Sequence, residues 1–133
     1  MRYSELIQLY FERSNALQAY WTLYVVVIGG LLAFSSLRKQ RDFVTTALVT
    51  VLYAFFAYKN LDAIHDTTVQ RFAALAAITQ SIPNPSEPSD TKRLHELLEP
   101  TLTPPPYNGV RRFHVTADIL TIAALWAMER RRV

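Results

Sequence analysis

The hydrophobic residues of this chain gather in long blocks, and the longest block covers residues 17–37. No Asp, Glu, Lys or Arg interrupts it. At about 1.5 Å per residue, a helix of this length crosses a hydrocarbon layer about 30 Å thick. Trp21 near its start and Arg38, Lys39 and Arg41 after its end are residue types that anchor a helix at the membrane boundary. The pattern predicts a first transmembrane helix.

A second block of sixteen uncharged residues lies within residues 42–60 and is about 24 Å long as a helix. Arg41 and Lys59 flank this block, and their side chains can extend toward water and lengthen the span. We predict a second transmembrane helix here. The apolar period continues beyond it and no proline occurs before Pro83, so the same helix is predicted to run on to about residue 80.

A third apolar block lies within residues 112–130 and is followed by arginines. Trp126 near its end favours an interfacial position, so this residue is another predicted membrane anchor. His114 and Asp118 interrupt the block and make its hydropathy the weakest of the three. We predict a third transmembrane helix, with a helix packed on the outside of the bundle as the alternative.

The segments outside these blocks differ in character. Residues 1–16 carry apolar residues at helical spacing among polar ones, which predicts an amphipathic helix that lies at the interface or runs into the first span. Residues 81–110 are rich in proline and predict an extramembrane segment, with one short helix at 91–99. The predicted fold is all-α: residues 1–133 form one integral membrane helical bundle with three transmembrane helices.

Composition agrees with a membrane protein. Half of the 133 residues are hydrophobic and 19% are charged, below the quarter that is usual in soluble domains. The chain has no cysteine, which excludes disulfides and cysteine-ligated metal centres. The net charge of +3 resides mostly beside the apolar blocks and forms no basic stripe with aromatic residues, so no nucleic-acid partner is predicted.

Lysine and arginine placement predicts the orientation of the chain. Basic residues are enriched in short cytoplasmic segments of membrane proteins. The loop at 38–41 and the tail at 130–132 both carry three of them and lie on one side if three spans are present. We therefore expect the N-terminus outside and the C-terminus in the cytoplasm, in a cell (inner) membrane. Glu5 and Glu12 before the first block are unlike the basic start of a signal peptide, so this span is expected to be retained.

Acidic and histidine side chains gather where the antiparallel spans would meet the outer boundary. Asp62, His65 and Asp66 share one helix face, and His114 and Asp118 share another. Imidazole and carboxylate groups at this spacing can ligate a divalent metal or carry a proton. The alternative is an interfacial network of hydrogen bonds and salt bridges. Apart from such a metal, the sequence predicts no cofactor.

Asp118 is predicted to lie inside the bilayer at the level of Tyr53. A carboxylate there costs about 3 kcal/mol or more unless it is paired or protonated, so it should face the bundle and meet His114, a tyrosine or a partner subunit. One hypothesis is proton or ion handling. The other is polar bonding between helices.

The sequence leaves three functions open. The chain can be a structural or interaction subunit of a membrane complex or homo-oligomer, with lipid and other membrane subunits or itself as partners. It can also form an oligomeric ion-conducting pore, or use the Asp/His cluster as a metal or proton site. No phosphate loop, nucleophile elbow or zinc-protease motif is present, which favours a non-enzymatic role.

Overall fold

The computed structural model describes residues 2–81 and 89–132, and these residues form helices joined by short connections. The elements are α1 (Tyr3–Leu37), α2 (Phe43–Gln80), α3 (Ser89–Leu98), the short 3₁₀-helix η1 (Glu99–Thr101) and α4 (Tyr107–Arg131). The described residues contain no strand, so the prediction of an all-helical chain is confirmed. The short helix α3 begins two residues before the predicted start at residue 91, and it ends at Leu98, just before η1.

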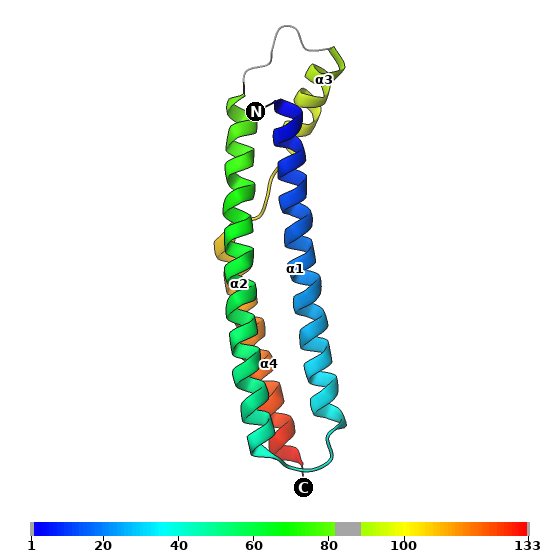
Figure 1. Cartoon of the computed structure of the whole chain (residues 1–133), viewed down its shortest axis with the longest axis vertical. Coiled ribbons are helices and arrows are strands. Elements are labelled where there is room, and N and C mark those ends of the chain that lie inside the picture. Colours follow the sequence, from blue (N-terminus) through cyan, green and yellow to red (C-terminus); the bar gives the residue numbers. More distant parts are fainter. Residues whose placement is uncertain (1, 82–88, 133) are drawn as a thin grey trace.

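Helices α1 and α2 form an antiparallel hairpin whose arms lie side by side along their whole length (Figure 1). With 35 and 38 residues, they are about 52 and 57 Å long. The amphipathic residues 1–16 and the apolar block after them belong to one continuous helix, which is one of the two arrangements that the sequence predicts. Helix α2 likewise continues to Gln80 without a break.

Helix α4 packs beside one part of this hairpin and leaves the other part as two helices. It packs beside α1 and α2 only along the half that ends at the connection 38–42 (Figure 1). We call residues 17–60 with 107–131 the three-helix half, and residues 3–16 with 61–80 the hairpin half. Helix α3 lies near the start of α1, where the rings of Tyr3 and His95 are 4.4 Å apart.

The hairpin half has an apolar core. Leu6 and Tyr10 of α1 pack with Ala74 and Ile78 of α2, and Leu102, which follows η1, joins them. Each of these residues is buried, and the polar residues of the same turns lie outside. The exposed polar residues include Ser4, Glu5, Gln8, Glu12, Asp62, Asp66 and Gln70, while the buried polar residues of this half are Thr67 and Thr68.

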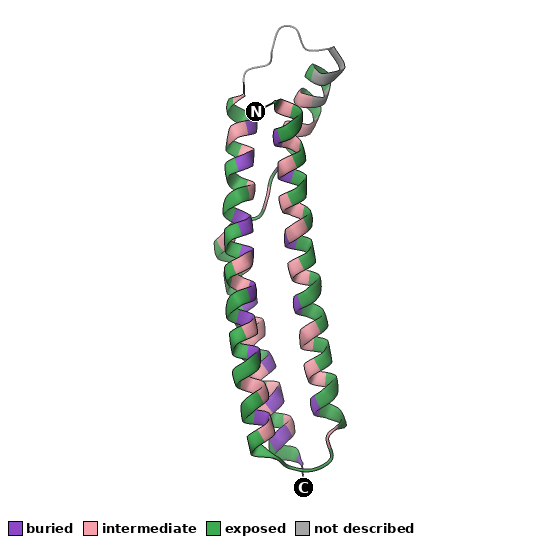
Figure 2. Cartoon of the chain, in the orientation of Figure 1, coloured by how far each residue is buried: buried purple, intermediate pink, exposed green. Residues whose placement is uncertain are grey.

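The three-helix half has the opposite distribution. Its buried residues are mainly polar or carry a polar group, and they face one another along the inner side of the helices (Figure 2). The buried residues with polar groups are Tyr24, Ser35, Thr46, Tyr53, Asn60, His114, Thr121 and Glu129, together with Arg132 directly after α4, and the buried apolar residues are Leu17, Ala57 and Leu125. Its exposed residues are large and apolar, and they include Val25, Val26, Leu37, Val44, Phe55, Ile119 and Leu120.

Within the described residues, α1 and α2 are long and apolar enough to cross a membrane, by length and composition. Only 11% of the most apolar window of α1 and 22% of that of α2 are buried inside the chain, so most of this apolar surface faces outward. Helix α4 does not pass this test, because its arginines, His114, Asp118 and Glu129 lower its hydropathy.

Candidate functional site

The centre of the three-helix half contains a hydrogen-bonded network around His114 of α4. Its side chain has no exposed surface, and its ring stacks on Tyr24 of α1 with 4.1 Å between centroids. Nδ1 lies 2.8 Å from Oδ2 of Asp118, one turn along α4, and Nε2 lies 3.1 Å from Oδ1 of Asn60 on α2. One imidazole thus contacts all three helices.

Asp118 is the second residue of this network at which several hydrogen bonds meet. The hydroxyl groups of Tyr24 on α1 and Tyr53 on α2 donate to its Oδ1 at 2.6 and 2.7 Å, and Tyr24 also lies 3.2 Å from the carbonyl oxygen of His114. His114 and Tyr53 are two of the partners that the sequence predicts for Asp118. The carboxylate is therefore satisfied by groups from each helix.

Asn60 extends the hydrogen bonding of His114 to α1. The amide nitrogen of Asn60 donates to the carbonyl oxygen of Tyr20 at 3.3 Å, and its amide oxygen faces Nε2 of His114. Both ring nitrogens of His114 therefore face oxygen atoms, Oδ2 of Asp118 and Oδ1 of Asn60. Groups on α2 and α4 thus fix the orientation of the ring.

A second network, of hydrogen bonds and salt bridges, lies at the end of the three-helix half beside the connection 38–42. Glu129 of α4 has no exposed surface, and its carboxylate accepts from the backbone N–H of Asp42 at 2.5 Å and from the hydroxyl of Thr46 at 2.8 Å. Arg132 forms a salt bridge to the same carboxylate. The negative charge of Glu129 lies at the N-terminus of α2, where the helix dipole stabilises an anion.

Arg132 contacts the opposite helix end. Its guanidinium donates to the carbonyl and hydroxyl oxygens of Ser35 and, through Nε, to the carbonyl oxygen of Arg38 at 3.1 Å. These carbonyls belong to the C-terminal end of α1, where the dipole favours a cation. Glu129 and Arg132 together connect the end of α1, the start of α2 and the end of α4.

Asp42 itself caps the start of α2. Its Oδ1 accepts from the backbone N–H groups of Val44 and Thr45, both at 3.1 Å, and the hydroxyl of Thr45 donates to Oδ2 at 2.6 Å. This cap explains why α2 begins directly after a short connection.

The predicted metal cluster is not assembled. His65 and Asp66 are exposed and lie 3.4 Å apart, and the ring of His65 meets Tyr107. His114 and Asp118 instead pair with each other inside the bundle, and Asp62 is exposed. Across residues 2–81 and 89–132, no three His, Asp or Glu side chains are placed to hold one metal ion. The prediction does not include the rotation of each helix about its axis. That rotation places His65 and Asp66 at the surface and His114 and Asp118 inside the bundle.

The predicted boundary anchors occupy both ends of the three-helix half. Trp21 packs against Phe113 with 5.8 Å between ring centroids, and Trp126 stacks on Phe43 at 6.4 Å. Among the basic anchors, Lys39 is exposed. Arg38 donates to Thr46 at 3.1 Å, and Arg41 donates to the carbonyl oxygen of Arg130 at 2.7 Å.

Sequence reasoning missed several members of both networks. Asn60, Tyr24 and the pair Glu129 and Arg132 were not singled out, because a polar residue near the end of an apolar block resembles a solvated flank. A usable signal exists for two of them. Glu129 and Arg132 have opposite charge and i, i+3 spacing, and they would lie beside the predicted tight connection.

Comparison of the chain with protein-family models, curated proteins and solved structures finds no match. The functional argument therefore rests on the chain's own residues.

Proposed function

We propose that this chain is an integral membrane protein whose three-helix half spans the bilayer with residues 17–37, 42–60 and 112–130. The observation that carries the proposal is the distribution of side chains in that half, where polar residues are buried and large apolar residues are exposed. Water would favour the reverse arrangement, whereas lipid requires polar groups to be satisfied internally.

The dimensions of α4 support its inclusion as a third span. Arg112 and Arg130 are separated by about 27 Å along the helix, close to the thickness of a hydrocarbon layer. Between them, Phe113, Ile119 and Leu120 are each more than 60% exposed. His114 and Asp118 face inward and are paired, so they do not oppose insertion as isolated charges would.

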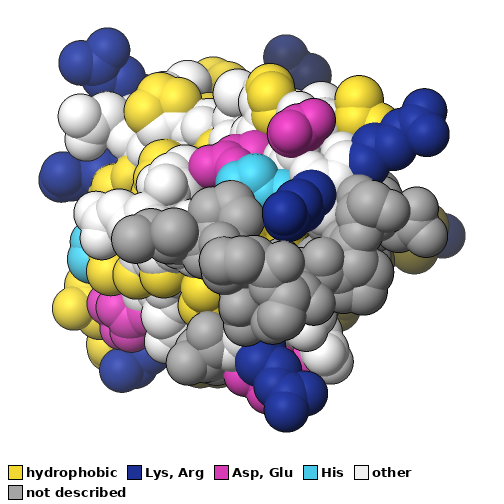
Figure 3. Space-filling view, turned by 90° about the horizontal axis from the view of Figure 1, so that it is seen from above, with side chains coloured by type: hydrophobic (Ala, Val, Ile, Leu, Met, Phe, Trp, Pro, Cys, Tyr) yellow, Lys and Arg dark blue, Asp and Glu magenta, His cyan; other side chains and the backbone are white. Residues whose placement is uncertain are grey.

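The proposed orientation puts the connection 38–42 and the C-terminus in the cytoplasm of a cell (inner) membrane. Lys39, Arg130 and Arg131 are exposed at that end, which is the arrangement that the positive-inside rule favours. The hairpin half and α3 then project outside. The view onto this end shows both acidic and basic side chains among hydrophobic ones (Figure 3).

Within the membrane, we assign the chain a structural role, as an interaction subunit of a membrane complex or a homo-oligomer. The two polar networks join the three helices, and their hydrogen-bonding groups contact one another. Gly29 and Gly30 leave open space beside α1, which allows a neighbouring helix to approach closely.

Labelling of single cysteines tests the membrane assignment, because the natural chain has none. In intact cells, an impermeant maleimide should label Ser4→Cys and should reach Lys39→Cys only after permeabilisation. Labelling of both sites in intact cells, or recovery of the chain in the soluble fraction, would contradict the proposal.

Neutral replacements test the structural role. Asp118→Asn and His114→Gln should preserve the oligomeric state measured by light scattering in detergent, because each retains hydrogen-bonding atoms. Ion conductance by the purified wild-type oligomer in planar bilayers, lost in these variants while assembly persists, would instead support the pore alternative.

The contact between His114 and Asp118, which places two proton-accepting groups 2.8 Å apart inside the bundle, supports a second candidate, proton handling within the membrane. This role requires a proton to enter or leave the pair at an accessible pH. The nitrogen chemical shifts of His114, measured by NMR between pH 5 and 9, should then change. Constant shifts over that range would identify the pair as a permanent structural element.

A further inference from the structure

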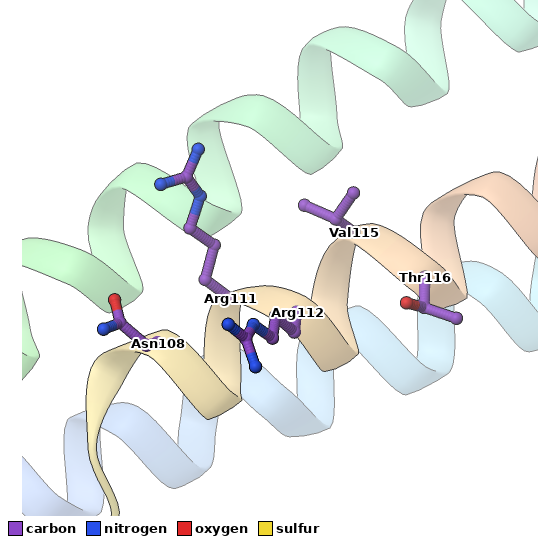
Figure 4. A pocket seen from close by; sticks show the side chains of 5 residues that line it. All are labelled: Asn108, Arg111, Arg112, Val115 and Thr116. Carbon is purple, nitrogen blue, oxygen red and sulfur yellow. The ribbon is translucent and has the colours of Figure 1, made fainter.

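The outer end of α4 carries two arginines that the polar networks do not use. Arg111 and Arg112 are exposed and, with Asn108, Val115 and Thr116, line a shallow groove (Figure 4). Within the part of the chain that the structure describes, neither guanidinium has a carboxylate within salt-bridge distance. At the opposite end of the three helices, Arg38 and Arg132 both lie within salt-bridge distance of Glu129.

The side chains below these arginines become apolar in the direction of the proposed bilayer centre. Figure 4 shows Arg111 and Val115 projecting on one side of α4, while Arg112 and Thr116 project on the next. The same two rows continue to Ile119 and Leu120, which are 63% and 64% exposed. In each row, the guanidinium of an arginine therefore lies on the outer side of an exposed apolar residue, Ile119 or Leu120.

A second surface on the same helix turns adds apolar contact area. Trp21, Pro105, Pro106, Gly109, Val110 and Phe113 line an almost wholly apolar groove on another face of these turns. Trp21 is the aromatic type that settles at the level of lipid head groups. Arg111 and Arg112 belong to the same level, because they are about 27 to 30 Å above the cytoplasmic arginines of α4.

We propose that Arg111 and Arg112, with Asn108, bind the phosphate of an anionic phospholipid whose acyl chains lie along Val115, Ile119 and Leu120. This inference rests on the proposed insertion of α4 in the bilayer. Guanidinium groups suit phosphate because they combine permanent charge with several N–H donors in a fixed plane. An anionic lipid also supplies the hydrocarbon that the lower part of the groove requires, which free phosphate cannot do.

Fluorescence quenching by brominated lipids tests the site. A Trp126→Phe variant retains Trp21 as its one tryptophan, next to the groove. This protein is reconstituted in phosphatidylcholine vesicles that contain an equal small fraction of brominated phosphatidylglycerol or brominated phosphatidylcholine. The anionic lipid should quench Trp21 more strongly, with a relative affinity increased about fivefold per arginine.

Substitution locates the effect. Arg111→Gln with Arg112→Gln should bring the relative affinity of the two lipids close to one. The matched control, Arg130→Gln with Arg131→Gln, removes two exposed arginines from the other end of α4 and should leave the preference at Trp21 unchanged. Equal quenching by both lipids in the parent protein, or loss of the preference in both double variants, would overturn the lipid site.

Two further outcomes separate the possible errors. If neither brominated lipid quenches Trp21, the residue is not in contact with the bilayer, and the proposed insertion of α4 fails together with the lipid site. If excess inorganic phosphate abolishes the preference for the anionic lipid at constant ionic strength, the arginines bind free phosphate and the lipid assignment is wrong. Persistence of the preference under these conditions supports the lipid.

Discussion

The two halves of this helical hairpin differ in which side chains they bury and which they expose. The hairpin half buries Leu6, Tyr10 and Ile78 and exposes charged residues, as a soluble protein does. The three-helix half buries His114 and Glu129 and exposes valine, leucine and phenylalanine. The same two helices run through both halves, so the difference lies in which face of each helix is apolar. Under the proposed insertion, it marks where along the hairpin water would be replaced by lipid.

The two cores also differ in how they specify structure. Apolar contacts are non-directional, so the hairpin half can tolerate small changes in side-chain shape. Hydrogen bonds among His114, Asp118 and the two tyrosines require defined distances and angles. The three-helix half should therefore be the more sensitive half to single substitutions.

Replacing a central residue of the polar core should lower the free energy of unfolding more than any other change proposed here. Asp118→Ala leaves the imidazole of His114 and two tyrosine hydroxyls without their acceptor inside the bundle. Loss of one partner from such a buried pair costs about 3–5 kcal/mol of unfolding free energy. Unfolding by SDS titration from mild detergent, followed by circular dichroism, measures this change.

A matched variant separates the network from packing alone. Replacing the whole group with apolar residues of similar size, as Tyr24→Phe, Tyr53→Phe, His114→Leu and Asp118→Leu together, should recover much of the stability, because no polar group is left unsatisfied. If Asp118→Ala unfolds at the wild-type SDS concentration, the network contributes little to the bundle.

The same substitution on the outer faces of the two halves should have unequal effects. Val26 is 64% exposed in the three-helix half, and Val26→Arg places a charge near the centre of the proposed first span at a cost of about 2.5–3.5 kcal/mol. Gln8 is exposed in the hairpin half, so Gln8→Arg should be neutral. Membrane fractionation of both variants compares the effects, and equal recovery in the membrane pellet would contradict the assignment of the two solvents.

A conservative change in the apolar core should have a smaller effect. Ile78 has no exposed surface, and Ile78→Val removes one methylene group at a cost of about 0.5–1.5 kcal/mol. Thermal unfolding measures the loss. Val69→Ala on an exposed face of the same helix serves as the control and should change the midpoint less. A larger fall for the exposed position would mean that this face is covered in the assembly.

The smallest effect is expected at the cap of α2, where the exposed Asp42 accepts hydrogen bonds from the backbone of Val44 and Thr45. Asp42→Ala should lower the thermal midpoint slightly, because these first N–H groups of α2 lose their acceptor. Asp42→Ser retains a capping oxygen and should lose less. Thermal unfolding of both variants measures the difference, and an equal loss in both would exclude the cap as the cause.

Much of the secondary structure follows from the sequence. The apolar blocks, the absence of proline between residues 1 and 82 and the basic residues at 38–41 predict a long antiparallel hairpin with a tight connection, and the structure has one. These features depend on residues close together along the chain. The same local signals placed His114 and Asp118 one turn apart on one helix, where they do pair.

The composition of the candidate site depended on the tertiary structure instead. The rotation of α2 and α4 about their axes decides whether His114 meets Asn60 or the acidic residues at 62 and 66. A rotation of about 100°, the angle between successive residues of a helix, changes the partner. Contacts such as that between Ser35 and Arg132 join positions 97 residues apart and leave no local signal. The sequence thus determined which segments are helical and which are the most apolar, because periodicity and hydropathy are local properties. Only the packing of three helices decided which polar groups share a hydrogen bond or an ion pair, because those contacts require a specific rotation and depth for each helix.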